Sequence, residues 1–251
     1  MAGRVDLARP AYFRSMRFFY APEVSTPFHE LDAEETRHVV KVLRAQVGDA
    51  CVLTNGRGAV YEGVIHQLDK RTCILQTKWV REDAPSARPL QLLVAPTKAT
   101  DRFEWMLEKA MELGVEGIWP LVTTRSERTR EKPDRWMRIL VAALKQSQQT
   151  RLPELHPMMP WSDALAAQGQ RRGFIAHCLP ALGDSGKPHL LHAAAGPLGA
   201  WVAIGPEGDF TPEEIREALA LGAQEVTLGE HRLRTETAGV AAVHSFHLAA
   251  L

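Results

Sequence analysis

The sequence predicts an α/β protein of two folded domains joined by a short linker. Residues 16–84 contain strand-like runs separated by turn residues, including Asn55-Gly56, a pair typical of a β-hairpin. Residues 90–251 alternate apolar strands with amphipathic helices, and this alternation indicates a parallel sheet covered by helices on both faces. Prolines bracket residues 85–89, which we interpret as the linker.

The first domain is expected to be mainly β. Residues 1–15 are arginine-rich and without clear periodicity, and we interpret them as an N-terminal extension. Asp32, followed by Glu35 three residues later, is expected to cap one helix that continues to about Leu43. Strand-like apolar runs occupy residues 17–20, 50–54, 59–65 and 73–80.

The second domain is expected to contain five strands, at residues 90–95, 117–122, 173–178, 200–204 and 225–228. Asp101 is expected to cap a helix that Gly114 ends, and Glu104 would be its capping-box partner. Thr211-Pro212-Glu213-Glu214 combines a capping residue, a first-turn proline and a capping-box glutamate. Two further helices are expected at residues 134–148 and 236–250.

The composition is that of an ordinary globular protein. Of 251 residues, 45% are hydrophobic and 24% are charged, and the formal net charge is zero. No apolar run reaches the roughly 20 residues of a membrane helix, and no signal peptide is evident. Cys51, Cys73 and Cys178 are far apart and form no CxxC pair. We therefore expect a soluble, reduced, cytoplasmic protein without a membrane partner.

Basic residues are concentrated between residues 125 and 151. Eight lysines and arginines there face three acidic residues, whereas residues 201–251 are acidic. Such a segment suits a polyanion, of which nucleic acid is the obvious one. It is equally typical of a solvated helix face with i,i+4 ion pairs, and charge by itself favours this second interpretation.

Most standard catalytic signatures are missing from the sequence. It has no GxSxG, HExxH or Walker motif, and Gly56-Arg57-Gly58 belongs to a hairpin, not to a dinucleotide-binding turn. The histidines are scattered, and the two closest sets, His189 with His192 and His244 with His247, have no carboxylate or cysteine nearby, so no metal site is expected. Two segments remain, residues 204–211 and 228–238, which each join a strand to a helix through glycine and charged residues and are expected at the ends of adjacent strands. Such turns expose backbone groups to a small polar ligand, although each could also be a glycine turn needed only for its geometry.

Several of these runs resemble the ribosomal RNA small subunit methyltransferase E family. The resemblance extends over residues 17–245 and is most specific in two runs, Gly205-Pro206-Glu207-Gly208-Asp209-Phe210-Thr211-Pro212-Glu213-Glu214 and Leu228-Gly229 to Leu233-Arg234-Thr235-Glu236-Thr237-Ala238. It is also carried by Glu108 to Val115, Arg135-Trp136, Gln146-Ser147 with Arg151-Leu152-Pro153, Arg17-Phe18-Phe19, and His38 to Asp49.

The resemblance implies a PUA-like β-barrel for RNA binding, over residues 16–84. A SPOUT methyltransferase domain with a deep C-terminal trefoil knot would follow over residues 90–251. The implied activity is transfer of a methyl group from S-adenosylmethionine to N3 of a uridine in small-subunit (16S) ribosomal RNA. The implied partners are that RNA, expected within an assembled 30S particle, and a second copy of the chain in a homodimer.

The resemblance, together with the glycine turns, also implies site residues. An arginine beside a uracil carbonyl would stabilise the anion that forms when N3 loses its proton; the candidates, unranked, are Arg125, Arg151 and Arg234. Glu207 and Glu236 are alternatives for the base, which stays unassigned. The expected cofactor residues are Leu179, Ile204, Gly205, Pro206, Glu207, Gly208, Leu228, Gly229, Leu233, Arg234, Thr237 and Ala238. The expected RNA-binding residues are Arg17, Arg44, Arg125, Arg128, Arg130, Lys132 and Arg151.

The sequence departs from the family pattern in three places. Asp209 occupies the position of a usual second glycine, and the cofactor turn is expected to tolerate it if the carboxylate points outward. Gln148-Gln149 replaces a common Gly-Arg, and residues 1–15 have no counterpart. The alternative function is a non-catalytic RNA-binding protein of the same fold, which would have no need of the two glycine turns. A Rossmann-type methyltransferase is disfavoured, because no glycine-rich turn follows an early strand of the second domain.

Overall fold

The computed structural model describes residues 17–182 and 186–250, and it divides into two compact units. The first unit extends to Ala84 and also includes Leu144–Arg151, whereas the second consists of Pro85–Ala143 and the chain from Leu152 onward. The expected extension at residues 1–15 lies outside the described residues. Within the described ranges, every helix falls short of the length and apolar character needed to cross a membrane.

The sheet of the first unit contains five strands in the order β1–β3–β4–β5–β2. Strands β1 (Arg17–Tyr20) and β3 (Ala50–Thr54) are parallel, and the remaining neighbours, including β4 (Ala59–Leu68) and β5 (Cys73–Glu82), are antiparallel. The expected strands are therefore confirmed. The sequence analysis missed β2 (Phe28–Glu30), because three residues are too few to show a period.

One helix, α1 (Ala33–Lys41), packs into the core of the first unit through Val39. Its expected cap is confirmed, since an Asp32 carboxylate oxygen accepts the backbone N–H groups of Glu34 and Glu35, each at 2.8 Å. The helix ends earlier than expected, at Lys41, and Val42 takes the C-cap position.

The segment Leu144–Arg151 belongs to the first unit, although the sequence analysis expects it within the second domain. The Thr150 carbonyl oxygen accepts the Gly58 N–H at 2.9 Å and the Thr54 hydroxyl at 3.0 Å. These bonds join residues almost one hundred positions apart, so no local pattern could have indicated them.

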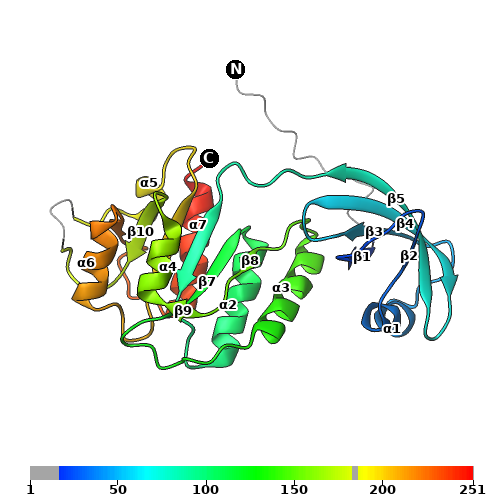
Figure 1. Cartoon of the computed structure of the whole chain (residues 1–251), viewed down its shortest axis with the longest axis horizontal. Helices are drawn as coiled ribbons and strands as arrows, with labels where there is room; N and C mark the ends of the chain where they lie inside the picture. Colours follow the sequence, from blue (N-terminus) through cyan, green and yellow to red (C-terminus); the bar gives the residue numbers. More distant parts are fainter. Residues whose placement is uncertain (1–16, 183–185, 251) are drawn as a thin grey trace, which may run out of the picture. The chain divides into compact units, whose positions relative to one another are not determined.

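The second unit (Figure 1) is built on one parallel sheet, as expected. The order of its strands is β12–β10–β11–β6–β7–β8. The five expected strands are present as β6 (Leu90–Val94), β7 (Gly117–Val122), β10 (Arg172–Ala176), β11 (Ala200–Ile204) and β12 (Gln224–Val226). The short β8 (Glu154–Leu155) and β9 (Met159–Pro160) both pair with β7.

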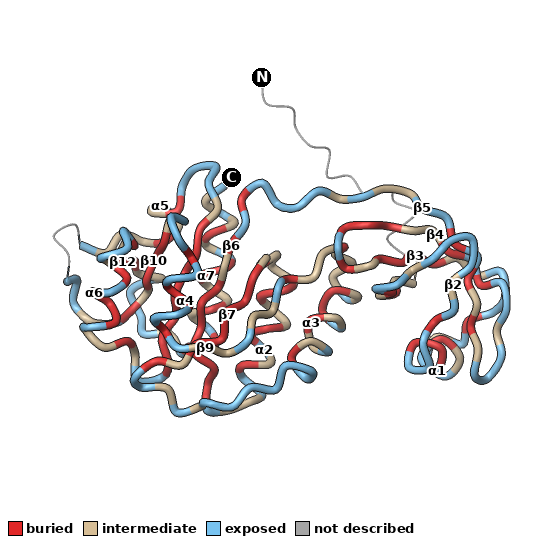
Figure 2. The backbone as a smooth tube through the Cα atoms, in the orientation of Figure 1, coloured by how far each residue is buried: buried red, intermediate tan, exposed pale blue. Residues whose placement is uncertain are grey.

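Helices cover both faces of this sheet, as the alternation of elements predicts. On one face α4 (Trp161–Gln168) and α6 (Pro212–Ala220) share an apolar cluster with β6, β10 and β11. On the other face α7 (Thr235–Leu248) packs against α2 (Thr100–Glu112), β6 and β11, and also contacts the short α5 (Leu190–Ala193). Figure 2 shows that buried residues are concentrated in the central strands and on the helix sides that face them. The chain of the second unit also forms most of α3 (Pro133–Ser147).

The helix-capping predictions succeed at α6 and fail at α2. At α6 the Thr211 hydroxyl accepts the Glu214 N–H at 3.2 Å, and the Glu214 carboxylate accepts the Thr211 N–H at 2.8 Å. Helix α2 begins at Thr100 after the N-cap Ala99, so the prediction of Asp101 as its cap is wrong. Asp101 lies within the first turn, where a carboxylate is favoured by the positive end of the helix dipole.

Candidate functional site

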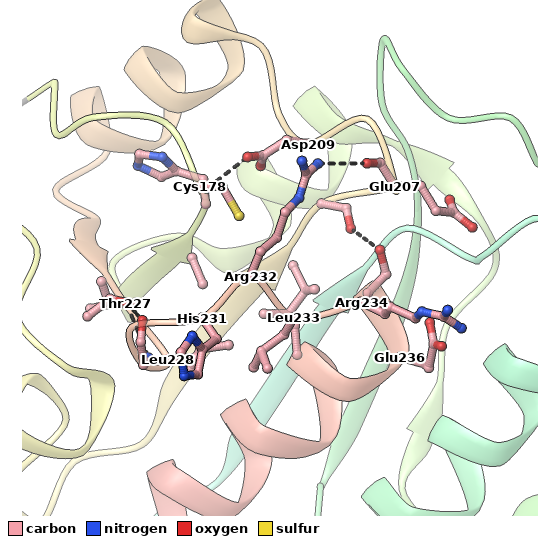
Figure 3. Close-up of a pocket in the computed structure, with 18 of the residues that line it drawn as sticks. Cys178, Glu207, Asp209, Thr227, Leu228, His231, Arg232, Leu233, Arg234 and Glu236 are labelled. Atoms are coloured by element: carbon pink, nitrogen blue, oxygen red, sulfur yellow. Dashed lines mark hydrogen bonds between the residues drawn. The ribbon is translucent and has the colours of Figure 1, made fainter.

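A cavity of about 840 Å³ lies at the carboxyl ends of three strands in the second unit, which is the usual position of a ligand site in a parallel sheet. Its walls come from the segments that follow β10, β11 and β12, from the first turn of α7 and from one residue of α2 (Figure 3). The lining residues include Ala176 to Cys178, Ile204 to Glu207, Asp209, Val226 to Glu236, Ala238, Lys187 and Arg102.

The segment after β11, residues 205–210, is fixed by contacts with three other parts of the second unit. The Glu207 carboxylate accepts the Lys98 N–H at 2.9 Å, and the Thr235 hydroxyl donates to the Gly205 carbonyl at 3.1 Å. An Arg125 guanidinium nitrogen donates to the Gly208 carbonyl at 2.8 Å. A Cβ atom at Gly205 would lie 3.1 Å from the backbone N of Phe210, so the turn is closed tightly upon itself.

Asp209 does not point outward, so the condition under which the turn was expected to tolerate it is not met. Its carboxylate lines the cavity and accepts the Cys178 N–H at 2.8 Å, a bond that connects the segment after β11 with the end of β10 (Figure 3). The geometry of the turn explains this orientation, because Asp209 has a positive φ of 64° and a second backbone N–H, that of Phe210, beside it.

The segment after β12, residues 227–234, contacts the segment after β11. An Arg232 guanidinium nitrogen donates to the Glu207 carbonyl at 3.4 Å, and Gly229 adopts a φ of 141°, within the range that favours glycine (Figure 3). The Thr227 hydroxyl stabilises this turn by donating to the Gly229 carbonyl at 2.7 Å. The two segments identified in the sequence therefore form one site.

The sequence analysis was wrong to treat these two segments as following adjacent strands. β10 lies between β11 and β12, and the residues after it, His177 and Cys178, form a third wall of the cavity. Strand order is decided by packing of distant segments, so the sequence could not show this. The apolar run at residues 173–178 was nevertheless a usable signal, because any strand of a parallel sheet can contribute a ligand-binding carboxyl end.

A buried hydrogen bond between His177 and Glu225 supports this third wall. His177 Nε2 lies 2.9 Å from Glu225 Oε1, and both side chains are almost fully buried. Burial lowers the pKa of His177, as does the nearby Lys187, whereas Glu225 raises it. The Lys187 ammonium group donates to the carbonyl oxygens of His177 and Leu179 at 2.7 and 2.6 Å, which orders the chain after β10.

A second pair of charges lies where α2 and α7 border the cavity. Arg102 Nε is 3.8 Å from Glu236 Oε1, and Glu236 is largely buried. Arg234 occupies the N-cap position of α7 without a side-chain capping bond, and its side chain lines the cavity near Glu236 (Figure 3). Arg102 was missed because it belongs to an amphipathic helix more than one hundred residues earlier.

The three candidate arginines have different environments. Arg234 lines the cavity. Arg125 does not, and its guanidinium is bound to the carbonyl oxygens of Gly208 and Phe210 at 2.8 and 3.3 Å. Arg151 belongs to the first unit, where its guanidinium donates to the Asp83 carbonyl at 2.7 and 3.0 Å.

Nine of the twelve expected cofactor residues line the cavity, and seven of them lie in the segments after β11 and β12, with Ile204 at the end of β11 and Ala238 in α7. The other three are Leu179, Gly208 and Thr237. The carbonyl oxygens of Leu179 and Gly208 are occupied by Lys187 and Arg125, and Thr237 is exposed on the first turn of α7. The nine are Ile204, Gly205, Pro206, Glu207, Leu228, Gly229, Leu233, Arg234 and Ala238.

The expected RNA-binding residues are divided between the units, with Arg17, Arg44 and Arg151 in the first and the other four in the second. Arg17 pairs with Asp49 at 2.9 Å. The Arg128 guanidinium donates to the Thr100 hydroxyl at 2.6 Å, whereas Arg130 and Lys132 are exposed. Arg44 adopts a φ of 47°. That these residues form one positive surface stays a prediction.

The described residues contain no group of three histidine, cysteine, aspartate or glutamate side chains that could hold a metal ion. The cavity is instead built from glycine turns and their backbone groups, with charged side chains of both signs. A cavity of this size and composition suits a small polar molecule with an apolar part.

Comparisons with known protein families match nearly the whole described chain. Residues 84–247 match the RNA methyltransferase domain, which contains every residue that lines the cavity. Residues 31–78 match the RNA methyltransferase PUA domain. A protein of Synechocystis named ribosomal RNA small subunit methyltransferase E is 28% identical over 237 residues, which cover 93% of this chain and 77% of the relative.

Solved structures show the same two-part fold. A probable rRNA-methyltransferase from Porphyromonas gingivalis is 34% identical with a TM-score of 0.82, covering 92% of this chain and 97% of that chain. A ribosomal RNA small subunit methyltransferase E from Neisseria gonorrhoeae, bound to S-adenosyl methionine, is 29% identical with a TM-score of 0.79. The match covers 91% of this chain and 95% of that one.

Proposed function

Because the chain belongs to the RNA methyltransferase family of the ribosomal RNA small subunit methyltransferase E proteins, we propose that it methylates N3 of a uridine in 16S ribosomal RNA, with S-adenosylmethionine as methyl donor. The observation that carries this proposal is the cavity itself. Most of its lining comes from the two segments on which the resemblance is most specific, and it lies wholly within the matched methyltransferase domain.

S-adenosylmethionine is the cofactor of this activity, and the residues of the cavity fit it. When bound, it supplies a methyl group already activated by the sulfonium charge. Residues 204–207 and 227–229 would hold it through backbone groups, since Gly205 and Gly229 line the cavity without a side chain to obstruct those groups. The relative from Neisseria gonorrhoeae was solved with this molecule bound.

The acceptor atom is an imide nitrogen, which becomes a good nucleophile when its proton leaves. Of the three candidate arginines, we assign Arg234 to the electrostatic role, since it lines the cavity and an arginine beside a uracil carbonyl stabilises the developing anion. Arg125 holds the segment after β11 in place through its bonds to backbone carbonyl oxygens. Holding N3 close to the methyl group accounts for much of the remaining acceleration.

The target nucleotide has to be unstacked before N3 can be reached, and this requires that the protein also bind the surrounding RNA. We assign this RNA binding to the first unit, which matches the PUA domain, and to the exposed basic residues Arg130 and Lys132 of the second unit. Phosphate contacts of this kind give affinity and orientation without reading sequence. The assembled 30S particle is the proposed substrate, in the cytoplasm.

Three further features belong to the same proposal: closure of the first sheet into a PUA-like β-barrel, a SPOUT trefoil knot at the C-terminus, and a homodimer. The strand order supports the knot, because β11 is inserted between β10 and β6. The chain after β12 also contacts the connection between β10 and β11, since the Thr227 N–H donates to the Pro188 carbonyl at 3.0 Å. Light scattering at micromolar concentration tests the homodimer, and a monomeric mass would contradict it.

The activity is tested in two steps. Calorimetric titration of the purified protein with S-adenosylmethionine should show binding. Small ribosomal subunits lacking the modification should then accept a labelled methyl group, recovered by mass spectrometry as 3-methyluridine. Label on a ribose or on a carbon atom would contradict the N3 assignment. RNA binding without cofactor binding would favour the non-catalytic alternative.

A further inference from the structure

We infer that Asp209 is a positioning residue whose carboxylate fastens the segment after β11 to the end of β10 and thereby sets the shape of the cofactor cavity. The inference rests on the proposed function, since it takes this cavity as the site of S-adenosylmethionine. It assigns a role to the residue at which the sequence departs from the glycine usual in the family.

The backbone at Asp209 turns sharply and does so without glycine. Its φ is 64°, in the left-handed region that few side chains tolerate, and its N–H donates to the Pro206 carbonyl at 2.9 Å. Among non-glycine residues aspartate and asparagine enter this region most readily, because their short polar side chains can bind nearby backbone groups. Glycine would meet the backbone requirement equally well, so the aspartate side chain needs a separate explanation.

The side chain supplies two hydrogen bonds that a glycine cannot. Asp209 Oδ1 accepts the Phe210 N–H at 2.8 Å, and Oδ2 accepts the Cys178 N–H at 2.8 Å. Phe210 is fully buried and packs against Trp161, with ring centroids 4.9 Å apart. The first bond therefore holds the Asp209 carboxylate to a residue that is fixed in the core. The second bond joins the carboxylate to Cys178, which follows the neighbouring strand β10.

The position of the second bond is what gives it an effect on the cavity. The ladder between β10 and β11 ends with the pair Ala176 and Ile204, after which the two chains separate. Cys178 and Asp209 both line the cavity beyond that last pair, so their bond links two of its walls (Figure 3). Without it, residues after β10 and β11 are free to move apart and widen the cavity.

The opposite side of the same segment is held independently. Arg125 binds the carbonyl oxygens of Gly208 and Phe210, and the Lys98 N–H binds Glu207. Loss of the Asp209 carboxylate therefore leaves the segment attached to the rest of the unit. We expect altered cofactor binding in a protein that remains folded.

The test compares three substitutions at this position. Asp209→Asn keeps an acceptor for one of the two N–H groups but presents an amide donor to the other. Asp209→Gly suits the backbone and loses both bonds, whereas Asp209→Ala loses both bonds and also strains the left-handed backbone. Glu217→Gln removes an equivalent charge from an exposed position of α6 and serves as the control.

Calorimetry should show S-adenosylmethionine binding weakened about tenfold by Asp209→Asn, more by Asp209→Gly and most by Asp209→Ala, because each lost bond involves a charged acceptor. The control should bind like the original protein. The Michaelis constant for S-adenosylmethionine should rise in the same order, while kcat at saturating cofactor and the melting temperature of the cofactor-free protein change little.

The outcomes separate this inference from the function it rests on. If the original protein does not bind S-adenosylmethionine, the proposed function fails. If the original protein binds and Asp209→Gly binds equally well or more tightly, the positioning role is refuted while the function stands. If the melting temperature falls in parallel with affinity, and kcat falls with it, Asp209 is merely a structural residue and the inference is overturned.

Discussion

Replacing Gly205 by alanine would place a methyl carbon 3.1 Å from both Cδ2 and the backbone N of Phe210, and 3.3 Å from the Asp209 carbonyl carbon. Ordinary van der Waals contacts begin at 3.4 Å, so the turn would have to open by a few tenths of an ångström. Two of the three atoms are backbone of the same turn, and Phe210 is fully buried, so the strain cannot be relieved by rotating a flexible side chain. Gly205 itself lines the cavity.

Overpacking of this kind costs about 1–3 kcal/mol. If that cost falls on the cofactor-binding geometry, Gly205→Ala should weaken S-adenosylmethionine binding about tenfold, since about 1.4 kcal/mol corresponds to a factor of ten. Gly205→Val adds two more carbon atoms against the same backbone and should weaken binding about 100-fold or more.

The assay is calorimetric titration, with cooperative thermal unfolding as the check that both variants fold. Ala167→Val on the exposed side of α4 adds apolar volume away from the cavity and should leave the affinity unchanged. Original affinity in a folded Gly205→Val variant would refute the assignment of the cofactor to this cavity.

Three other predictions concern the residues proposed to bind RNA, the cysteine thiols and acid stability. Arg130→Ala combined with Lys132→Ala should weaken binding of any RNA and make that binding less dependent on salt concentration, because both side chains are exposed. The affinity for S-adenosylmethionine should not change. Methylation that is unchanged across salt concentrations would mean that these two residues are only solvated surface residues and do not bind RNA. Cys178 is exposed and lines the cavity, so S-adenosylmethionine should slow its alkylation by maleimide, and equal rates would count against cofactor binding there. Burial raises the pKa of Cys51 to about 12 and that of Cys73 to about 11, so neither should react in the folded protein. Burial also lowers the pKa of four histidines, His29, His156, His177 and His247. The unfolded chain therefore takes up protons first, and the free energy of unfolding should fall below about pH 6.5. Denaturant curves at pH 7.5 and 5.5 that coincide would contradict this.

Local rules in the sequence account for much of the fold. The capping box at Thr211 and Glu214 forms as predicted, because all its partners lie within four residues. Strands such as β6 and β11 were recognisable since a buried parallel strand is a short run of apolar residues. The cap at Asp101 failed because α2 begins two residues earlier, with Ala99 as its N-cap, a detail that propensity does not decide.

Two departures from the family pattern carry information of the same local kind. Gln148 and Asp209, each at a position where glycine is usual, have positive φ values of 54° and 64°. The glycine preference there thus has a backbone cause, and a non-glycine residue at such a position has to offset the strain with other contacts. At Asp209 the offsetting contacts are its two hydrogen bonds.

What the sequence by itself determined is the set of elements, the parallel sheet and the two glycine turns that line the cavity. The tertiary structure alone decided that β10 lies between β11 and β12, that Arg102 reaches Glu236, and that Arg125 is bound to carbonyl oxygens of the turn after β11. The physical reason is the range of the interactions involved. A cap or a turn is settled within a few residues, whereas strand order and the partners of a long side chain depend on the packing of segments that are distant in the sequence.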